Sequence, residues 1–136
     1  MFGMSVRQAL TSMSFLMAFF ISFTCTAAPK ANPIVRDLPA GLSATEVQSA
    51  VLEGCGIRGW ACKVIDEQTI EGSIWVRGKH YVKVDIFISE SSLSIRYSDS
   101  ENMKYNAKKN TIHKGYISWT NNLLGDISNI LLQKAI

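Results

Sequence analysis

Both histidines of this chain, His80 and His113, lie in segments that contain tyrosine, aspartate and asparagine, residue types that bind ligands or transfer protons. Turns predicted near residues 67, 78 and 90 fold the intervening chain into antiparallel strands. We expect one end of this sheet to gather the following residues: Trp60, His80, Tyr97, Asp99, Asn102, Tyr105, His113 and Tyr116. Hydrogen-bonding side chains above an aromatic floor are consistent with a pocket for a ligand or partner, which is one interpretation of these residues.

Catalysis and metal binding are weaker interpretations of the same residues. Ser100, His113 and Asp99 have the types of a hydrolase triad, but a triad needs its nucleophile on a strained turn, and the chain has no Gly-x-Ser-x-Gly motif. A metal centre needs three or four ligands in fixed geometry, which two histidines and one aspartate barely supply. We therefore predict no catalytic residue, no metal and no cofactor.

A structural role for this end of the sheet is the interpretation that we favour. The crossing segment 100–112 is long, and its backbone polar groups need hydrogen-bond partners. Buried tyrosine, histidine, aspartate and asparagine side chains would supply those partners and tie the segment to the sheet. This interpretation also explains why these residue types occur there.

The first residues of the chain have the order of a secretory signal. Arg7 is the only charged residue before a dense apolar run, 13–23, and small residues follow the run. The run is about 11 residues long, whereas a membrane-spanning helix needs about 20. We therefore predict a cleaved export signal, residues 1–24, in preference to a permanent transmembrane anchor.

Cys25 admits two cleavage products. In the first, Cys25 carries the lipid of a bacterial lipoprotein, and residues 25–41, with three prolines, form an extended tether to a domain at 42–136. In the second, signal peptidase cuts after Ala27 and releases a soluble periplasmic protein. Phe23 and Thr24 depart from the small residues usual before a lipid-modified cysteine. We expect the lipoprotein, with membrane contact through the lipid, and keep the soluble protein as the alternative.

The other two cysteines, Cys55 and Cys62, form an even pair in an exported protein. Either a disulfide staples the short segment between them, or two free thiols are buried. Both remain open, because short loops often miss the Cα separation of about 5.5 Å that a disulfide requires. No second cysteine pair stands nearby to complete a zinc site.

Charge excludes one class of partner. The formal net charge is +3, which is too weak for a protein that must neutralise many phosphates, so we predict no nucleic-acid partner. A local cluster, Lys104, Lys108, Lys109 and Lys114, is interpreted as a solvated loop, with contact to anionic lipid or cell-wall polymer as the alternative.

The periodicity of apolar residues predicts a single α+β domain. Ser43 and Glu46 have capping-box spacing and begin a helix over 44–54. Residues 60–99 alternate with period two and form four strands in a meander, with Trp60, Cys62 and Val64 facing the core from the first. Residues 112–135 form a long helix. The predicted fold is a two-layer sandwich in the order α-β-β-β-β-α, with both helices on one face.

Side-chain matching also predicts the strand register. A three-residue loop around Gly78 pairs Val76 with His80, and the next turn pairs Ile88 with Leu93. The sheet face away from the helices then carries charged residues and three aromatic residues: Trp75, Tyr81 and Phe87. Aromatic residues rimmed by charge can mark a contact surface, and an ordinary solvated face is the alternative.

Three segments together carry a family resemblance: Arg77 to His80; Tyr97 to Asn102 with Tyr105; and Ile112 to Tyr116 with Trp119. The pattern, which spans about 42–131, resembles a family of small proteobacterial envelope proteins, many of them lipoproteins. The family has no established activity, so the resemblance implies only an envelope address and the same small domain. We expect a non-catalytic binding or accessory module whose partner is an envelope protein or cell-wall component. A soluble periplasmic protein that binds a small ligand or cell-wall fragment and an enzyme of unrecognised class are the alternatives.

Overall fold

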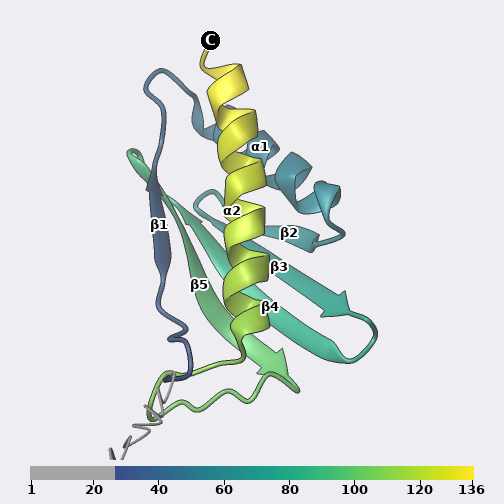
Figure 1. The fold of residues 1–136 in the computed structure, drawn as a ribbon. Helices are drawn as coiled ribbons and strands as arrows, with labels where there is room; N and C mark the ends of the chain where they lie inside the picture. The colour runs from purple at the N-terminus through teal and green to yellow at the C-terminus, as the bar shows by residue number, and fades with distance from the viewer. Residues whose placement is uncertain (1–26) are drawn as a thin grey trace, which may run out of the picture.

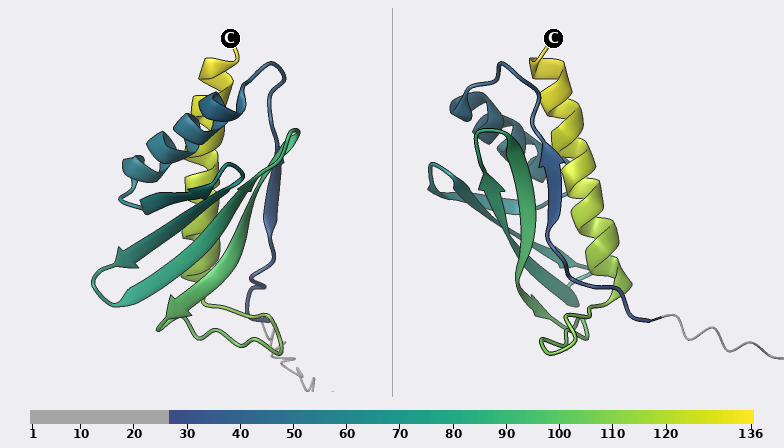
Figure 2. Two further views of the ribbon diagram at one scale, coloured as in Figure 1. Left: turned by 180° about the vertical axis from the view of Figure 1, so that it is seen from behind. Right: turned by 90° about the vertical axis from the view of Figure 1, so that its left-hand side faces the viewer.

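The computed structural model describes residues 27–136; the predicted signal and Cys25 lie outside the described residues. Five antiparallel strands form one sheet: β1 (Ile34–Asp37), β2 (Ala61–Asp66), β3 (Thr69–Val76), β4 (His80–Ile88) and β5 (Ser92–Glu101). Two helices, α1 (Ala44–Ile57) and α2 (Lys114–Lys134), lie on one face of the sheet (Figures 1 and 2). The α+β sandwich is therefore confirmed, with five strands instead of four.

The extra strand is β1, which lies within the segment predicted to be a tether. It pairs with β5, so that the order across the sheet is β1-β5-β4-β3-β2. Ile34 lies opposite Ile95, and Asp37 lies opposite Ser92. The prediction missed this strand because it has only four residues and stands between Pro33 and Pro39, which is a composition typical of linkers. Proline is tolerated beside an edge strand because one side of that strand makes no ladder bonds.

The predicted register is confirmed across the three central strands. Val76 pairs with His80 and Ile70 with Ile86 between β3 and β4. Ile88 pairs with Leu93 between β4 and β5. Gly78 has a φ of 62°, the left-handed conformation that the predicted loop requires.

A bulge interrupts the register farther along β5. Val84 lies opposite Tyr97, but its neighbour Lys83 lies opposite Asp99, so Ser98 is an extra residue. Because side chains alternate between the faces of a strand, this insertion turns Asp99 to the outer face and Ser100 to the helix-covered face. The bulge therefore reassigns residues at the end of the sheet where the candidate site was predicted to lie.

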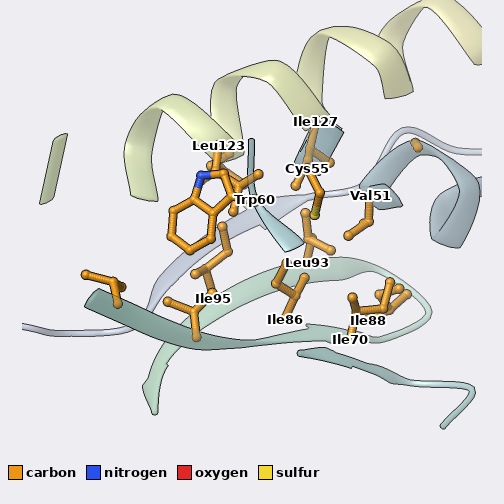
Figure 3. Close-up of a cluster of buried hydrophobic side chains, with 14 of the residues drawn as sticks. Val51, Cys55, Trp60, Ile70, Ile86, Ile88, Leu93, Ile95, Leu123 and Ile127 are labelled. Carbon is orange, nitrogen blue, oxygen red and sulfur yellow. The ribbon is translucent and has the colours of Figure 1, made fainter. Parts of the chain in front are cut away.

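The core fills the space between the sheet and the two helices (Figure 3). Ile70, Ile86 and Ile95 are fully buried on the sheet, and Leu123 and Ile127 meet them from α2. The predicted capping box begins α1: the Ser43 hydroxyl accepts a hydrogen bond from the Glu46 N–H at 3.1 Å, and the Glu46 carboxylate accepts one from the Ser43 N–H. Trp60 is buried in this core, whereas Val64, also predicted to be buried, is 40% exposed because edge strand β2 is only partly covered.

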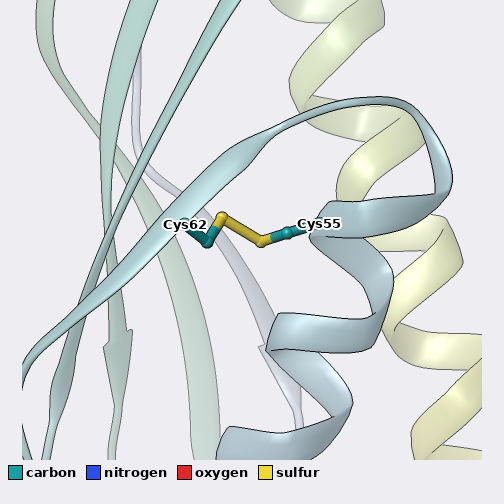
Figure 4. The surroundings of a disulfide bond; sticks show 2 residues. All are labelled: Cys55 and Cys62. Atoms are coloured by element: carbon teal, nitrogen blue, oxygen red, sulfur yellow. A yellow bond between two sulfur atoms is a disulfide. The ribbon is translucent and has the colours of Figure 1, made fainter.

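A disulfide joins Cys55 at the end of α1 to Cys62 in β2, with a Cα–Cα distance of 6.2 Å (Figure 4). Of the two predicted alternatives, the structure therefore contains the disulfide. Gly72 makes room for it on the sheet, because a Cβ there would lie 3.1 Å from the Cys62 Sγ. The bond staples the first helix to the edge of the sheet.

Candidate functional site

The two histidines meet at the end of the sheet where β4 begins. Their rings stack with centroids 5.6 Å apart, although 33 residues separate them in sequence. Trp119, one and a half turns into α2, lies with its ring 6.1 Å from that of His80. The predicted convergence of both histidines on one locus is therefore what the structure shows, and both side chains are half-buried.

Each histidine uses its Nδ1 atom to hold the backbone. The His80 Nδ1 lies 2.8 Å from the Asn102 carbonyl oxygen; because a carbonyl only accepts, that nitrogen carries the proton. The His113 Nδ1 accepts a hydrogen bond from the Gly115 N–H at 2.9 Å, which makes His113 the N-cap of α2. The Asn102 side-chain amide donates to the Lys79 carbonyl at 3.3 Å and closes the turn against the crossing segment.

Three tyrosines form a second group beside the histidines. Tyr97 and Tyr105 stack with centroids 4.0 Å apart, and Tyr116 meets Tyr97 edge-on at 5.7 Å. The Tyr97 hydroxyl is hydrogen-bonded to the Ser100 hydroxyl at 2.7 Å. Burial raises the pKa of both the Tyr97 and the Tyr116 phenol, so both are protonated at neutral pH.

Two residues predicted for this end lie elsewhere. Trp60 is buried near Leu123 and Cys55 in the middle of the core (Figure 3). Asp99 is exposed on the outer face because of the β5 bulge, and its carboxylate accepts from the Ser100 N–H at 2.8 Å. The remaining six, His80, Tyr97, Asn102, Tyr105, His113 and Tyr116, form the histidine and tyrosine groups.

Sequence reasoning also missed two residues that complete this end. Met103 is 1% exposed, and its carbonyl accepts a hydrogen bond from the His113 N–H at 2.8 Å. Met103 therefore attaches the crossing segment to the core. Trp119 packs on His80. A signal for Trp119 existed, since it lies three residues after Tyr116 on the same helical stripe. Met103 had no such signal, because an isolated apolar residue in a polar loop has no period.

The contacts favour an ordered structural junction over a reactive centre. The Ser100 hydroxyl bonds Tyr97, and the Asp99 carboxylate bonds backbone, so neither side chain has His113 as its hydrogen-bond partner. Among residues 27–136, no three histidine, cysteine, aspartate or glutamate side chains are grouped to hold a metal ion. The crossing segment is hydrogen-bonded to both the sheet and the helix, as the structural interpretation requires.

The outer face of the sheet presents a different kind of site. Trp75 and Tyr81 are cross-strand partners whose rings are 4.9 Å apart, and Trp75 is 56% exposed. Lys83 and Glu71 form an ion pair at 3.4 Å beside them. Both helices lie on the opposite face, so no helix of the described chain covers this aromatic pair (Figure 2).

Phe87 lies toward the other end of β4, opposite Thr69, and does not join Trp75 and Tyr81. The Arg96 guanidinium lies over its ring, 4.5 Å from the centroid, and the ring is half-buried. Arg96 is directly across from Asp85, but the ion pairs of the described residues do not include these two. A guanidinium gains more from lying on an adjacent aromatic face than from an exposed carboxylate in water. The aromatic contact on the uncovered part of this face therefore consists of Trp75 and Tyr81.

Comparisons with known proteins identify no relative of this chain. From Ala27 onward, no helix is both long enough and apolar enough to cross a membrane. No protein-family model, no curated protein and no solved structure matches this chain.

Proposed function

We propose that this protein is exported to the cell envelope, where it is anchored through a lipid on Cys25 and acts as a binding module without catalytic activity. The observation that carries the proposal is Trp75, which is 56% exposed and contacts the half-buried Tyr81 ring on the one sheet face that no helix of the described chain covers. An exposed aromatic side chain lowers the solubility of a protein, and tryptophan and tyrosine are enriched where proteins bind one another. The proposed partner is an envelope protein that docks on this face.

The disulfide supports the envelope address. Cys55 and Cys62 are bonded, and disulfides persist in oxidising compartments such as the periplasm. The sequence resemblance to proteobacterial envelope proteins points to the same compartment. A soluble periplasmic protein that binds a ligand at the histidine end has less support, because the polar groups there are engaged with one another.

The test of the binding face is a pair of matched substitutions in the full chain. Trp75→Ala removes a side chain that is 56% exposed on the outer sheet face, and Leu132→Ala removes one that is 57% exposed on α2. We expect the first variant to lose a partner captured by the wild-type protein from envelope extract, and the second to retain it. Truncating a central aromatic anchor costs about 2 kcal/mol or more of binding, roughly 30-fold in affinity.

Folding must be checked in the same samples. Trp75→Ala loses one aromatic contact, worth about 0.5–1.5 kcal/mol beyond the burial of the ring, from a side chain that is already 56% exposed, so the domain should remain folded by circular dichroism. Partner capture that survives Trp75→Ala, or that falls equally with Leu132→Ala, would contradict the proposed binding face.

For the anchor, intact mass of the wild-type protein should show a diacylglyceryl addition that Cys25→Ala abolishes.

A further inference from the structure

The chain joins the domain beside the crossing segment, at the end of the molecule where α2 begins (Figure 2). The Ala31 N–H donates to the Asn110 carbonyl at 2.9 Å, and the Ile112 N–H donates to the Pro29 carbonyl at 2.9 Å. The Lys30 ammonium donates to the Lys109 carbonyl at 2.6 Å. Residues 29–31 are thus fixed to this end, and Cys25 precedes Ala27 by only two positions in the sequence.

The same end is basic. Five exposed lysines lie on the joined segments: Lys30, Lys104, Lys108, Lys109 and Lys114. The sequence from Asn102 to Gly125 contains no acidic residue, and neither does the sequence from Ala27 to Arg36. The acids that border these two stretches are Glu101 at the end of β5, which faces the outer side of the sheet, Asp37 at the end of β1 and Asp126 within α2. We call the five lysines the basic end.

An ordered loop holds these lysines in place. Asn102, Lys104 and Asn110 all have left-handed backbone, with φ of 56°, 52° and 52°. A lysine rarely adopts this conformation, so the surrounding structure must impose it. Burial of Met103 and the paired backbone bonds between Asn106 and Thr111 do so. The loop therefore presents its charges in a defined arrangement.

A notch of 280 Å³ lies among these groups. Its walls come from the incoming segment, at Ala28 and Pro29, and from Ile112 and His113, with Lys104 and Lys114 also lining it. Two ammonium groups beside an apolar floor suit the phosphate and the glycerol region of a phospholipid headgroup. Lysine side chains contribute their charge to such a contact while their alkyl stems lie along the apolar surface.

We propose that the basic end rests on an anionic phospholipid surface, with a headgroup phosphate between Lys104 and Lys114. The anchoring role in this inference rests on the proposed lipid at Cys25, but the affinity for anionic lipid does not. The short path from Cys25 to the fixed residues 29–31 would hold the lysines at the bilayer.

The test uses the exported full chain with Cys25→Ala, so that no lipid contributes to binding. Sedimentation is measured with phosphatidylcholine vesicles, with and without phosphatidylglycerol, over a range of salt. Lys108→Ser with Lys109→Ser removes two charges from the basic end. The control, Arg36→Ser with Lys63→Ser, removes two exposed charges from β1 and β2. The side chains of Lys108 and Lys109 are not hydrogen-bonded in the fold, so stability should be unchanged.

We expect binding only when phosphatidylglycerol is present, weakening as salt rises. Each lysine near an anionic membrane contributes about fivefold in affinity, so the loop variant should bind about 25-fold more weakly and the control within about twofold of the parent. Equal losses in both variants, equal binding to both vesicles, or binding to cell-wall sacculi without vesicle binding would each overturn the inference. Failure of the anchor is read separately, from the mass of wild-type Cys25.

Discussion

Alanine in place of Gly54 is expected to destabilise the domain, although alanine is the better helix former. Gly54 lies where α1 crosses α2, and a Cβ at this position would lie 2.5 Å from the Ile127 Cγ1 and 3.2 Å from the Ile127 N and Cα. Ile127 is fully buried, so it has little room to withdraw. The glycine is therefore needed for the two helices to approach one another.

The expected change in the free energy of unfolding is the difference between a gain in helix propensity and a loss in core packing. Helix propensity favours alanine over glycine by about 1 kcal/mol. Forcing an extra methyl group into a filled core costs about 1–3 kcal/mol. The net expectation is a loss of about 0–2 kcal/mol. Gly56, in the same helix, has nothing within 4 Å of its Cβ position, so Gly56→Ala should keep only the gain, up to about 1 kcal/mol.

Urea denaturation of the oxidised protein, followed by circular dichroism, measures both variants, and the Gly56 variant should be the more stable by about 1–3 kcal/mol. Combining Gly54→Ala with Ile127→Ala supplies a second check. The methyl group introduced at position 54 partly fills the cavity that the isoleucine leaves, so the double variant should be more stable than the sum of the single losses predicts. Equal stability of the two glycine variants, or strict additivity with Ile127→Ala, would refute the close helix contact.

Two further predictions concern the ends of α2 and α1. His113→Ala should lower the free energy of unfolding by about 1 kcal/mol, because the Gly115 N–H loses its acceptor. His113→Asn can still cap the helix and should lose less. Thermal melts measure both variants, and equal losses would contradict the capping role. Replacing both Cys55 and Cys62 by alanine should lower the free energy of unfolding by about 2.5 kcal/mol, the chain-entropy value for a loop with a sequence separation of 7. In the same urea titration, a reductant should destabilise the wild type by the same amount and leave the double variant unaffected.

The sheet was predictable where side-chain types constrain the register. Between β3 and β4, a three-residue loop keeps Ile70, Ile74 and their partners on a common face whereas a two-residue loop would mix the faces, and the structure has the three-residue loop. The capping box of α1 and the apolar stripe of α2 are equally local signals. These features depend on spacing within a few residues, which the sequence displays directly.

The candidate site was predictable only as far as that register extends. His80 and His113 converge because strand order and loop length bring them together. The bulge at Ser98 has no sequence signal, and it moves Asp99 to the outer face. Trp60 was assigned both to the core, by its period-two position, and to the site, by its place just before β2, and the structure places it in the core. Strand β1 was not predicted, because its pairing with β5 is a long-range contact that spacing within a few residues does not display.

The pairing of β1 with β5 has a mechanical consequence. β1 continues into the segment that leads toward Cys25, so a pull at the proposed anchor would enter the strand at its N-terminal end and draw it lengthwise past β5. Tension in that direction loads the bonds from Ile34 to Asp37 together, in shear, and does not unzip them one at a time. The backbone bonds of Pro29 and Ala31 to the crossing segment must break as well. A domain held this way would resist being unfolded by force applied through the proposed anchor.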